Sequence, residues 1–567
     1  MNKKNTKGTV LIVSLMAVTV LLILGAMFIV RAISEKAASD RERMLTQAFY
    51  LADGGSQVGI NQMDVLINTN LMATVNNTNP QVIANDAAGY VASGDGLGFL
   101  IQYARDGGAA QFILNGAQAR YTGSVIAAGS GTYQHSIIVT EKGNPIAVTP
   151  EQWDFPYYYR IETTGTVGGV VRKIALTGDF TVRVQRDNFA RFALFTDHHS
   201  LPSGGTVWFT SRTNFSGPLH TNERYSFAFN PSGTFDGMVT QHHNSARFHN
   251  GGSSILSDAD QNASIDVPVF NSDYERGVSE VNLESSVQQQ DLIDQARGTD
   301  TTPGNGIFVA NNGSNLIGGI FVRGDCNVNM SVNGSGNAVY TITQGATTKI
   351  VTVDISGNQT TVQTVAGPIQ TFSGLPDGVD DVGTILYVDG AISSLGGTVQ
   401  RDTKLTVASQ NDVILTNHVM YEDYTPAVGT PGTPGYVAPH ADDTNNMLGI
   451  VSWGGDVRIG TVAPDDINIH GSVMARNGVL TVDNYDDTAV GSRGVTTLLG
   501  GSITQFYGAF GQFNSVTEQQ ISGYGRNFVY DNRMSLGAAP PYFPSMRTFI
   551  AFTNDLTDKI TWQEGGF

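Results

Sequence analysis

The segment KGTVLIVSLMAVTVLLILGAMFIVRAISEK, residues 7–36, determines how the rest of the chain can be arranged. Residues 9–30 contain no charged side chain, and these 22 residues, at about 1.5 Å of rise each, are long enough to span the hydrocarbon core of a bilayer. The stretch RAISEK that follows Val30 offers no compact small-x-small site, so removal by signal peptidase is not expected. The sequence therefore predicts a retained transmembrane helix over residues 9–30.

Charge around this helix predicts its orientation. Lys3, Lys4 and Lys7 lie in a basic leader, residues 1–8, and an excess of basic residues marks the cytoplasmic side of a membrane. We therefore expect a single-pass protein of the cytoplasmic (inner) membrane, with its N-terminus inside and a large extracytoplasmic domain. A plain signal anchor that is never cut is the alternative.

The helix is predicted to continue beyond the membrane. Residues 31–68 lack proline and place apolar residues largely at helical spacing. Gly54 and Gly55 interrupt this pattern, and each glycine costs a helix about 1 kcal/mol relative to alanine. A kink or local melting is therefore expected at these two residues.

The remainder of the chain is large, acidic and poor in cysteine. With 567 residues it exceeds one hydrophobic core, so two or three domains are expected. Residues 1–50 hold 7 basic and 3 acidic side chains, which leaves 25 basic against 47 acidic beyond them, a net charge of −22. Such a surface repels phosphate backbones, so no nucleic-acid partner is predicted. Cys326 is the one cysteine, so no intramolecular disulfide can form.

Strand patterns dominate after the helix, and the predicted fold class is mainly β. Residues 69–190 are assigned to a small α+β head, in which YYYRIETTGTVGGVVRKIALTGDFTVRVQ forms an antiparallel hairpin around Gly168 and Gly169. Residues 191–545 contain short strands closed by Gly and Asn, which favours a β-solenoid whose coils share one core. Because no exact repeat supports the solenoid, a β-sandwich is the alternative.

Two segments interrupt the predicted solenoid. SSVQQQDLIDQAR, residues 285–297, is the one convincing helical stretch of this region. TPAVGTPGTPGYVAP, residues 425–439, should form an exposed loop because proline and glycine alternate in it. Residues 546–567 are assigned to a C-terminal tail.

The N-terminal pattern resembles a known family. The basic leader ending in Gly8, the apolar run that begins at once, and RERMLTQAFYLADGG at residues 41–55 resemble the N-terminus of PilX-type minor pilins and pseudopilins of type IV pili. The resemblance covers about the first 65 residues. It implies a fold in which the helix precedes an α+β pilin-like head, and cleavage by a prepilin peptidase between Gly8 and Thr9.

One position departs from that family. The resemblance implies a Glu at the fifth residue of the mature chain, and Val13 stands there. A carboxylate without a partner is costly in apolar surroundings, so its loss suits a tip or initiating subunit with no neighbour ahead of it. Small residues, Ser14, Gly25 and Ala26, would let neighbouring helices approach closely in a filament bundle.

A second resemblance concerns the distal part. GPLHTN at residues 217–222, the YVDG to LTVAS stretch, and GYGRNFVYDNR running to PPYFP at residues 540–544 look like an uncharacterised bacterial ectodomain that is commonly fused to PilX-type N-termini. This resemblance spans roughly residues 190–545. It implies an assembly role and brings no known chemistry.

Histidines make zinc the first metal to consider. The six that lie close in sequence, with Asp197 as their acidic companion, are His198, His199, His220, His242, His243 and His249. Tetrahedral imidazole sites bind zinc well, but no HExxH or other zinc spacing is present. No zinc site is therefore predicted.

A weak calcium pattern follows. DADQNASID, residues 258–266, places Asp258, Asp260 and Asn262 at alternating positions, like the first ligands of a calcium loop. Ala263 stands where the loop needs glycine, and Val269 stands where a bidentate Glu should close the sphere. Exposed turns explain the three candidates equally well.

Catalytic patterns are weak in the sequence. Asp465 and Asp466, near Arg458 and Arg476, are the closest approach to the paired carboxylates of a glycan hydrolase. The sequence contains no nucleophile elbow, phosphate loop or dinucleotide fingerprint. We therefore predict neither a catalytic residue nor a cofactor, and not an enzyme.

The sequence as a whole predicts a minor pilin-like assembly subunit of a type IV pilus or pseudopilus that displays a large ectodomain at its tip or side. Expected partners are other pilins or pseudopilins through the N-terminal helix, prepilin peptidase, the inner-membrane assembly machinery and a surface or glycan ligand. The first alternative is a membrane-anchored adhesin or carbohydrate-binding protein that does not polymerise. The second is a solenoid polysaccharide-degrading enzyme.

Overall fold

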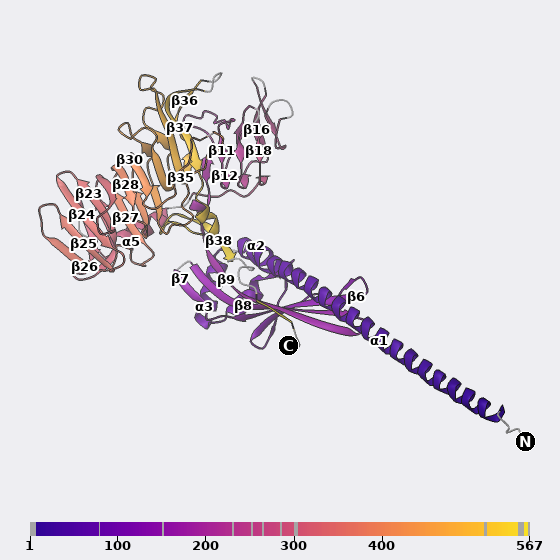
Figure 1. Cartoon of the computed structure of the whole chain (residues 1–567). Helices are drawn as coiled ribbons and strands as arrows, with labels where there is room; N and C mark the ends of the chain where they lie inside the picture. The colour runs from indigo at the N-terminus through magenta and orange to yellow at the C-terminus, as the bar shows by residue number, and fades with distance from the viewer. Residues whose placement is uncertain are drawn as a thin grey trace, which may run out of the picture. The chain divides into compact units, whose positions relative to one another are not determined.

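The protein is mainly β with one long N-terminal helix (Figure 1). The computed structural model describes residues 7–78, 80–149, 152–229, 232–250, 253–262, 266–283, 286–299, 304–431, 433–514, 519–553 and 561–564. Strands account for 45% of the chain and helices for 21%, which confirms the predicted fold class at this level. The chain divides into two compact units, unit 1 with Met1–Gln185 and Phe549–Phe567, and unit 2 with Arg186–Thr548.

Unit 1 begins with the helix α1, Lys7–Asp64, which continues as the π-helix η1, Val65–Leu71, and α2, Met72–Asn77. The local melting predicted at Gly54 and Gly55 is wrong, because α1 runs through both residues. The second glycine is buried against the sheet, where a Cβ atom would lie 2.6 Å from Thr163 Cγ2. Gly55 therefore permits close packing, and neither glycine ends the helix.

An antiparallel sheet forms the rest of unit 1, in the order β3-β4-β6-β8-β9, with β38 and β39 both paired to β9. β5 pairs with β6 and β7 pairs with β8. The strands are β3 Ile113–Asn115, β4 Gln118–Thr122, β5 Ile126–Ala128, β6 Gly131–Glu141, β7 Ile146–Thr149, β8 Gln152–Val167, β9 Val170–Asn188, β38 Ser545–Thr553 and β39 Thr561–Glu564. The hairpin predicted around Gly168 and Gly169 is confirmed, and both glycines take positive φ, 55° and 83°, as a two-residue type I′ turn requires.

The C-terminal tail predicted for residues 546–567 is wrong where the structure describes it. β39 pairs antiparallel with β9, with Thr561 opposite Thr177, and the Trp562 ring packs edge-on against Phe49 of α1. The chain thus returns to complete the sheet of unit 1 after all of unit 2. Two short strands, β1 Arg105–Asp106 and β2 Ala109–Ala110, and two helices, α3 Pro80–Ser93 and α4 Gly96–Tyr103, complete the unit.

Unit 2 is built on two parallel ladders in which alternate strands pair. One ladder contains β21 Leu316–Arg323, β27 Thr384–Asp389, β29 Lys404–Ser409, β31 Met447–Ser452, β33 Asn468–Ala475, β35 Ser492–Phe506, β10 Leu194–His198, β12 Leu219–Thr221, β15 Val239–Gln241 and β19 Tyr274–Arg276. The other contains β22 Cys326–Val332, β28 Ile392–Val399, β30 Val413–Tyr421, β32 Val457–Ile459 and β34 Leu480–Val482. From β21 to β34 the chain contributes one strand to each ladder in turn, whereas β35, β10, β12, β15 and β19 extend the first ladder alone.

Aligned apolar rows from both ladders form the core. Register places Ile320, Leu386, Val407, Ile450 and Val473 side by side in the first ladder, and all five are buried. Val328, Leu395, Leu415, Ile459 and Val482 form the matching row in the second ladder. These rows belong to one hydrophobic cluster, so strand alternation directs both ladders toward a shared core.

The opposite face of the first ladder is covered. Phe321, Ile385 and Tyr387 belong to a second cluster that includes Leu292 and Ala296 of the helix α5, Ser286–Arg297. This helix confirms the helical prediction for residues 285–297 over its described part. The proline and glycine segment, residues 425–439, extends as an exposed loop with bridges between Val428 and Val437, and Gly432 lies outside the described residues.

Two small sheets and three extensions of the ladders complete unit 2. β11 Asn214–Phe215, β14 Thr234–Phe235 and β18 Val269–Phe270 form one small sheet, and β13 Ser226–Phe227, β16 Ala246–Asn250 and β17 Ser253–Ser257 form another. β20 Gly306–Asn311 pairs with β21, and β36 Gly511–Phe513 and β37 Gln520–Val529 pair beside β35. β23 Ala338–Gln344, β24 Thr347–Asp354, β25 Gln359–Thr364 and β26 Ile369–Ser373 extend antiparallel from β22.

Candidate functional site

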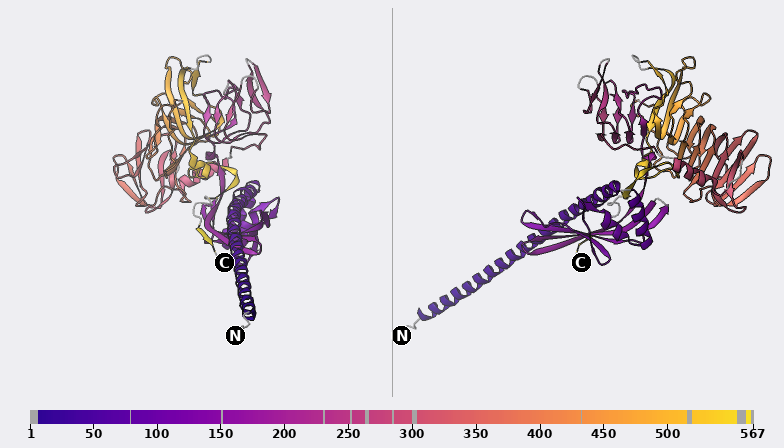
Figure 2. Two further views of the ribbon diagram at one scale, coloured as in Figure 1. Left: turned by 45° about the vertical axis from the view of Figure 1, so that its right-hand side comes forward. Right: turned by 180° about the vertical axis from the view of Figure 1, so that it is seen from behind.

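The first half of α1 is an apolar rod without a partner among the described residues of the chain. Large apolar side chains from Val10 to Val30 are 46–71% exposed. This stretch lies in the one helix of the described residues that is long and apolar enough to cross a bilayer. Figure 2 shows this part of α1 extending well past the sheet of unit 1.

Polar side chains within the rod are bonded to the helix itself. The Ser14 hydroxyl donates to the Leu11 carbonyl at 2.9 Å, and the Thr19 hydroxyl donates to the Leu15 carbonyl at 2.7 Å. Hydroxyls satisfied in this way carry little penalty in hydrocarbon, where an unpaired donor would cost several kcal/mol, on the order of 4–8 on alkane scales. The rod therefore suits an apolar environment along its whole length.

The predicted filament residues lie on this rod. Val13 places an apolar side chain at the position where the resemblance implies a carboxylate. This side chain is 62% exposed, so no described residue covers it. A Cβ atom at Gly25 would meet nothing within 4 Å. Ser14 and Gly25 are 25 − 14 = 11 residues apart, about three turns, and so share one face, whereas Ala26 lies about 100° away.

The predicted processing bond lies at the start of α1. Gly8 is within the helix and Thr9 is exposed. The leader residues Lys3 and Lys4 lie outside the described residues, so the structure bears only on the helical side of this bond.

Small residues fasten the second half of α1 to the sheet of unit 1. Ala48, Ala52, Gly55, Ser56 and Gly59 recur at helical spacing, and all five are buried. A Cβ atom at Gly59 would lie 2.5 Å from Ile161 Cγ2, and one at Gly165 of β8 would overlap the Ala48 carbonyl oxygen. Sequence analysis missed this interface, although the recurrence of small residues at three- and four-residue intervals was its signal.

The six histidines considered for zinc make separate contacts. His220 lies in β12, where Nδ1 is 2.9 Å from Thr240 Oγ1 and Nε2 is 3.0 Å from Asn222 Oδ1. His199 is buried among Phe209, Tyr225 and Tyr507, and burial lowers its pKa to about 3.

The other histidines of this group lie apart or bond elsewhere. His198 Nδ1 is 3.0 Å from Glu223 Oε1, with Asp197 at 3.7 Å, and His242 bonds the Val278 carbonyl. His243 is exposed, and the His249 ring contacts Trp208. Among the described residues no three His, Cys, Asp or Glu side chains are grouped to hold a metal ion.

The calcium candidates do not converge in the described part of their loop. Asp260 pairs with Arg276 at 2.6 Å, and the Asn262 amide donates to the His249 carbonyl. Asp258 is exposed. Residues 263–265 lie outside the described residues, so the structure does not bear on Ala263.

The nearest hydrolase candidates bind other partners. Asp465 pairs with Arg493 at 3.1 Å, and Asp466 Oδ1 accepts from the Val495 amide at 2.9 Å. Arg458 bridges Asp412 and Asp483, two carboxylates of the neighbouring strands' ends. Arg476 bonds Asn477 and lies over Trp453, so each of these four side chains contacts residues outside the candidate set.

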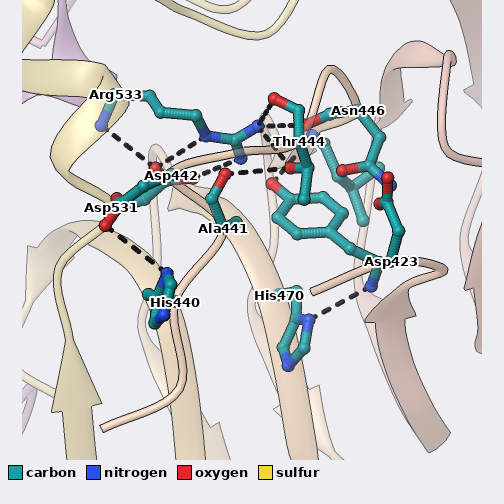
Figure 3. Close-up of polar contacts among 11 residues, drawn as sticks. Asp423, His440, Ala441, Asp442, Thr444, Asn446, His470, Asp531 and Arg533 are labelled. Carbon is teal, nitrogen blue, oxygen red and sulfur yellow. Dashed lines mark hydrogen bonds and ion pairs between the residues drawn. The ribbon is translucent and has the colours of Figure 1, made fainter. Parts of the chain in front are cut away.

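A buried polar cluster near the C-terminal end of unit 2 escaped sequence analysis (Figure 3). Arg533, in the short helix η3 Asn532–Leu536, forms two bonds to Asp531, Nε to Oδ1 at 2.9 Å and Nη2 to Oδ2 at 2.6 Å. Its Nη1 donates to the carbonyl oxygens of Thr444 and Asn446, at 2.9 and 2.8 Å, and its guanidinium lies over the Tyr421 ring.

This cluster is closed to solvent, with Asp531 at 1% and Arg533 at 9% exposure. The His470 Nδ1 accepts from the Tyr421 amide at its margin, and His440 lies 3.5 Å from Asp442 (Figure 3). The ion pair is closed to any substrate from solution, so we assign it a structural role. The bonds from Arg533 to Thr444 and Asn446 connect η3 to the segment 440–446. No local pattern could reveal the bonds from Arg533 to Thr444 and Asn446, which lie 89 and 87 residues away in the sequence.

Cys326 is buried, and burial raises the pKa of its thiol to about 12. The thiolate is the reactive form of cysteine, so this side chain is chemically inert in the folded protein.

Comparison with known proteins gives one match. The family described as Domain of unknown function (DUF4900) matches residues 154–243, which run from β8 to just beyond β15. No curated protein and no solved structure matches the chain. Over the hairpin β8–β9 and the first strands of unit 2, the chain is thus similar to a family whose description assigns no activity.

Proposed function

We propose that the protein is a minor pilin-like subunit, held in the cytoplasmic membrane by α1 and incorporated through that helix into a type IV pilus or pseudopilus. The observation that carries the proposal is the rod from Val10 to Val30, which is apolar, exposed and internally hydrogen-bonded. A bilayer and a bundle of like helices are the two environments that cover such a surface.

The attachment of α1 to unit 1 supports the same role. Small residues between Ala48 and Gly59 hold the helix against β6 and β8. A force on the rod would pass directly into a packed sheet, because one unbroken helix forms both parts. A subunit that is incorporated through its helix must transmit force from that helix to its folded domain in this way.

The residue at position 13 supports a specific place for the subunit in the filament. Val13 presents an exposed apolar side chain where a carboxylate would need a cationic partner. A subunit at the tip has no neighbour ahead to supply that partner, so the valine suits a tip or initiating position.

Unit 2 is proposed to be the displayed ectodomain, with its ladders forming the coils of a β-solenoid. Strands of each ladder pair in parallel with alternate strands of the chain, and the buried rows stay in register from strand to strand. Stacked coils bury a continuous core in this way, whereas the alternative, a β-sandwich, is usually built from antiparallel strands.

The test is the N-terminus of the protein extracted from membranes. Intact-mass and N-terminal sequencing should find a chain that begins at Thr9, and Gly8→Leu should block this trimming. Gly25→Leu serves as the matched control, because it adds the same side chain to the same helix away from the scissile bond. A mature chain that begins beyond residue 30 would contradict the proposal, because such a chain lacks the rod.

The second candidate, an anchored adhesin that never polymerises, predicts a different result. Cysteines introduced at Ser14 and Gly25 should form disulfides, under an added oxidant, with cysteines introduced into the helices of neighbouring pilins if the rod enters a bundle, because both positions are open on one face. Cysteines that stay unlinked in isolated filaments and membranes alike would favour the simple anchor.

A further inference from the structure

The strands β22 to β26 form an antiparallel extension of unit 2 (Figure 1), and their side chains alternate between buried and exposed positions. Its inward side chains alternate along each strand and join the main core. They include Val328, Met330, Tyr340, Ile342, Val351, Val353, Val362 and Phe372. The remaining side chains of these strands therefore point away from the core, because successive residues of a strand face opposite sides.

Register aligns the outward side chains into rows across the strands. One row contains Asn327, Thr343 and Thr348, and the Thr343 and Thr348 hydroxyls lie 3.0 Å apart. The next two rows are Asn329, Thr341, Ile350, Gln363 and Ile369, and Ser331, Val339, Thr352, Thr361 and Thr371. We call these thirteen residues the threonine face. All of them are exposed or half-exposed.

The threonine face carries no charge, although the chain has a net charge of −18. Strands β22 to β26 contain two charged residues. Lys349 points inward, where its Nζ donates to the Ile307 carbonyl at 2.6 Å. Asp354 lies on the same side of the sheet at the end of β24, opposite Gln359 and outside the thirteen residues, and its Oδ1 accepts from Ser356 Oγ and the Gly357 amide of its own turn.

Other exposed strand ends of unit 2 differ in this respect. Arg401 pairs with Glu422, and Arg458 pairs with Asp412 and Asp483. The threonine face instead offers hydroxyls and amides, each able both to donate and to accept, interspersed with methyl groups. Neighbouring strands lie about 4.8 Å apart and same-face residues along a strand about 6.8 Å apart, so these groups form a regular array.

We propose that the threonine face binds a neutral, hydroxyl-rich polysaccharide in its extended form. An uncharged polymer leaves no ion unpaired on this surface, whereas an anionic polymer would meet the acidic chain around it. Sugar rings present alternating hydroxyl and C–H groups, which match the hydroxyls and methyls of the array. The inference concerns unit 2 and does not depend on processing of the N-terminal helix.

The composition of the face also predicts how binding depends on length. Tyr340 and Phe372 point inward, so the threonine face has no aromatic ring on which a single sugar could stack. Each hydroxyl contact is weak, and affinity must come from many contacts along one chain. Soluble oligosaccharides of two to three sugars should therefore compete poorly, while insoluble polymer should retain the protein.

The experiment is a pelleting assay with the full-length protein in detergent. The probes are microcrystalline cellulose, chitin and insoluble β-1,3-glucan, with calcium alginate gel as the anionic polymer. We expect at least one neutral polymer to retain the protein at least ten times better than alginate. Retention on none of the three, or equal retention on alginate, would overturn the proposal.

Variants locate the binding surface. Thr341→Glu with Thr361→Glu places charges on β23 and β25 without setting them directly opposite each other, and it should lower retention at least ten-fold. Thr341→Val with Thr361→Val keeps shape and strand propensity, and it should lower retention by a smaller factor, about two- to five-fold.

Thr488→Glu, on an exposed loop of unit 2, is the matched control and should bind as the native chain does. Urea unfolding of each variant checks that it is folded, and the valine variant serves if the glutamate variant is not. Unchanged retention in the folded variants would remove binding from this face. Adsorption to growing ice crystals without retention on any polysaccharide would likewise overturn the proposal and assign the array to ice.

Discussion

At the residue scale, Gly54 and Gly55 show how neighbouring identical residues can have opposite roles. A Cβ atom at Gly54 would meet nothing within 4 Å, whereas one at Gly55 would lie 2.6 Å from both Thr163 Cγ2 and Tyr133 Cδ2. The sequence suggests a helix defect at both positions, but the structure uses one of them for contact with the sheet.

Substitution of each glycine by leucine should separate these roles. Gly55→Leu should destabilise unit 1 by about 1–3 kcal/mol through overpacking, while Gly54→Leu should be neutral or stabilise it by up to about 1 kcal/mol through helix propensity. Hydrogen exchange of β8 amides across a urea series would measure both effects. Equal effects of the two substitutions would contradict the packing described for Gly55.

Cys326 provides a second prediction at this scale. Its thiol is buried and its pKa is raised to about 12, so it should not react with a maleimide or an aromatic disulfide in the native protein at pH 8. In urea it should react at the rate of a free thiol. Rapid labelling without denaturant would show that the thiol is accessible.

At the element scale, η3 is held by a buried ion pair. Asp531 and Arg533 are almost fully enclosed, and Arg533 also bonds Thr444 and Asn446. Arg533→Met should cost about 3–5 kcal/mol, because it leaves the Asp531 carboxylate buried without its cation. Removing both charges, with Asp531→Asn added, should cost less than the single change. Urea unfolding of the two singles and the double would give the coupling energy, and additive costs would exclude the proposed pairing.

The rod of α1 is the other element with a direct test. An arginine at the centre of a membrane helix costs about 2.5–3.5 kcal/mol on insertion scales, so Leu22→Arg should shift the protein from the membrane to the alkaline-extractable fraction. Ser39→Arg adds the same charge to the same helix beyond the apolar stretch, and it should leave extraction unchanged. Identical behaviour of the two variants would mean that the rod does not enter the bilayer.

At the scale of unit 2, buried histidines link stability to pH. Burial lowers the pKa values of His199 and His470 to about 3, from an ordinary value of 6.5. The unfolded chain binds protons that the folded chain excludes, so stability is complete above pH 6.5 and falls as the pH drops toward 3. Each histidine contributes up to about 1.4 kcal/mol per pH unit in that window.

His470→Gln isolates one of these contributions, because the amide can still accept from the Tyr421 amide as Nδ1 does. Urea unfolding at pH 7.5 and pH 5 should show a smaller loss of stability in the variant than in the native chain. The same loss in both proteins would mean that His470 takes up its proton in the folded state.

Across the whole molecule, what sequence could reveal depended on how local the signal was. The apolar run of α1, the hairpin at Gly168 and Gly169, and the helix α5 were predicted because each is encoded by residues close in sequence. The local melting predicted in α1 failed because the sheet, and not helix propensity, decides the role of Gly55.

Long-range features remained out of reach for a different reason. Arg533 meets Asn446 across 533 − 446 = 87 residues, and β39 meets β9 across most of the chain. The sequence around each partner does not identify the other, because hydrogen-bonding groups and strand residues recur throughout the chain. The histidines follow the same rule, since closeness in sequence did not group three of their rings for a metal ion among the described residues.

The return of β39 to β9 has a consequence for biosynthesis. Unit 2 contributes the 548 − 186 + 1 = 363 residues that must be synthesised before the last strand reaches its place. Until then β9 presents unpaired amides and carbonyls along part of its length, a bare margin of the kind that invites aggregation and proteolysis. A chain truncated before β39 therefore has an incomplete sheet in unit 1. Pairing of β39 with β9 can occur only after all of unit 2 has been synthesised.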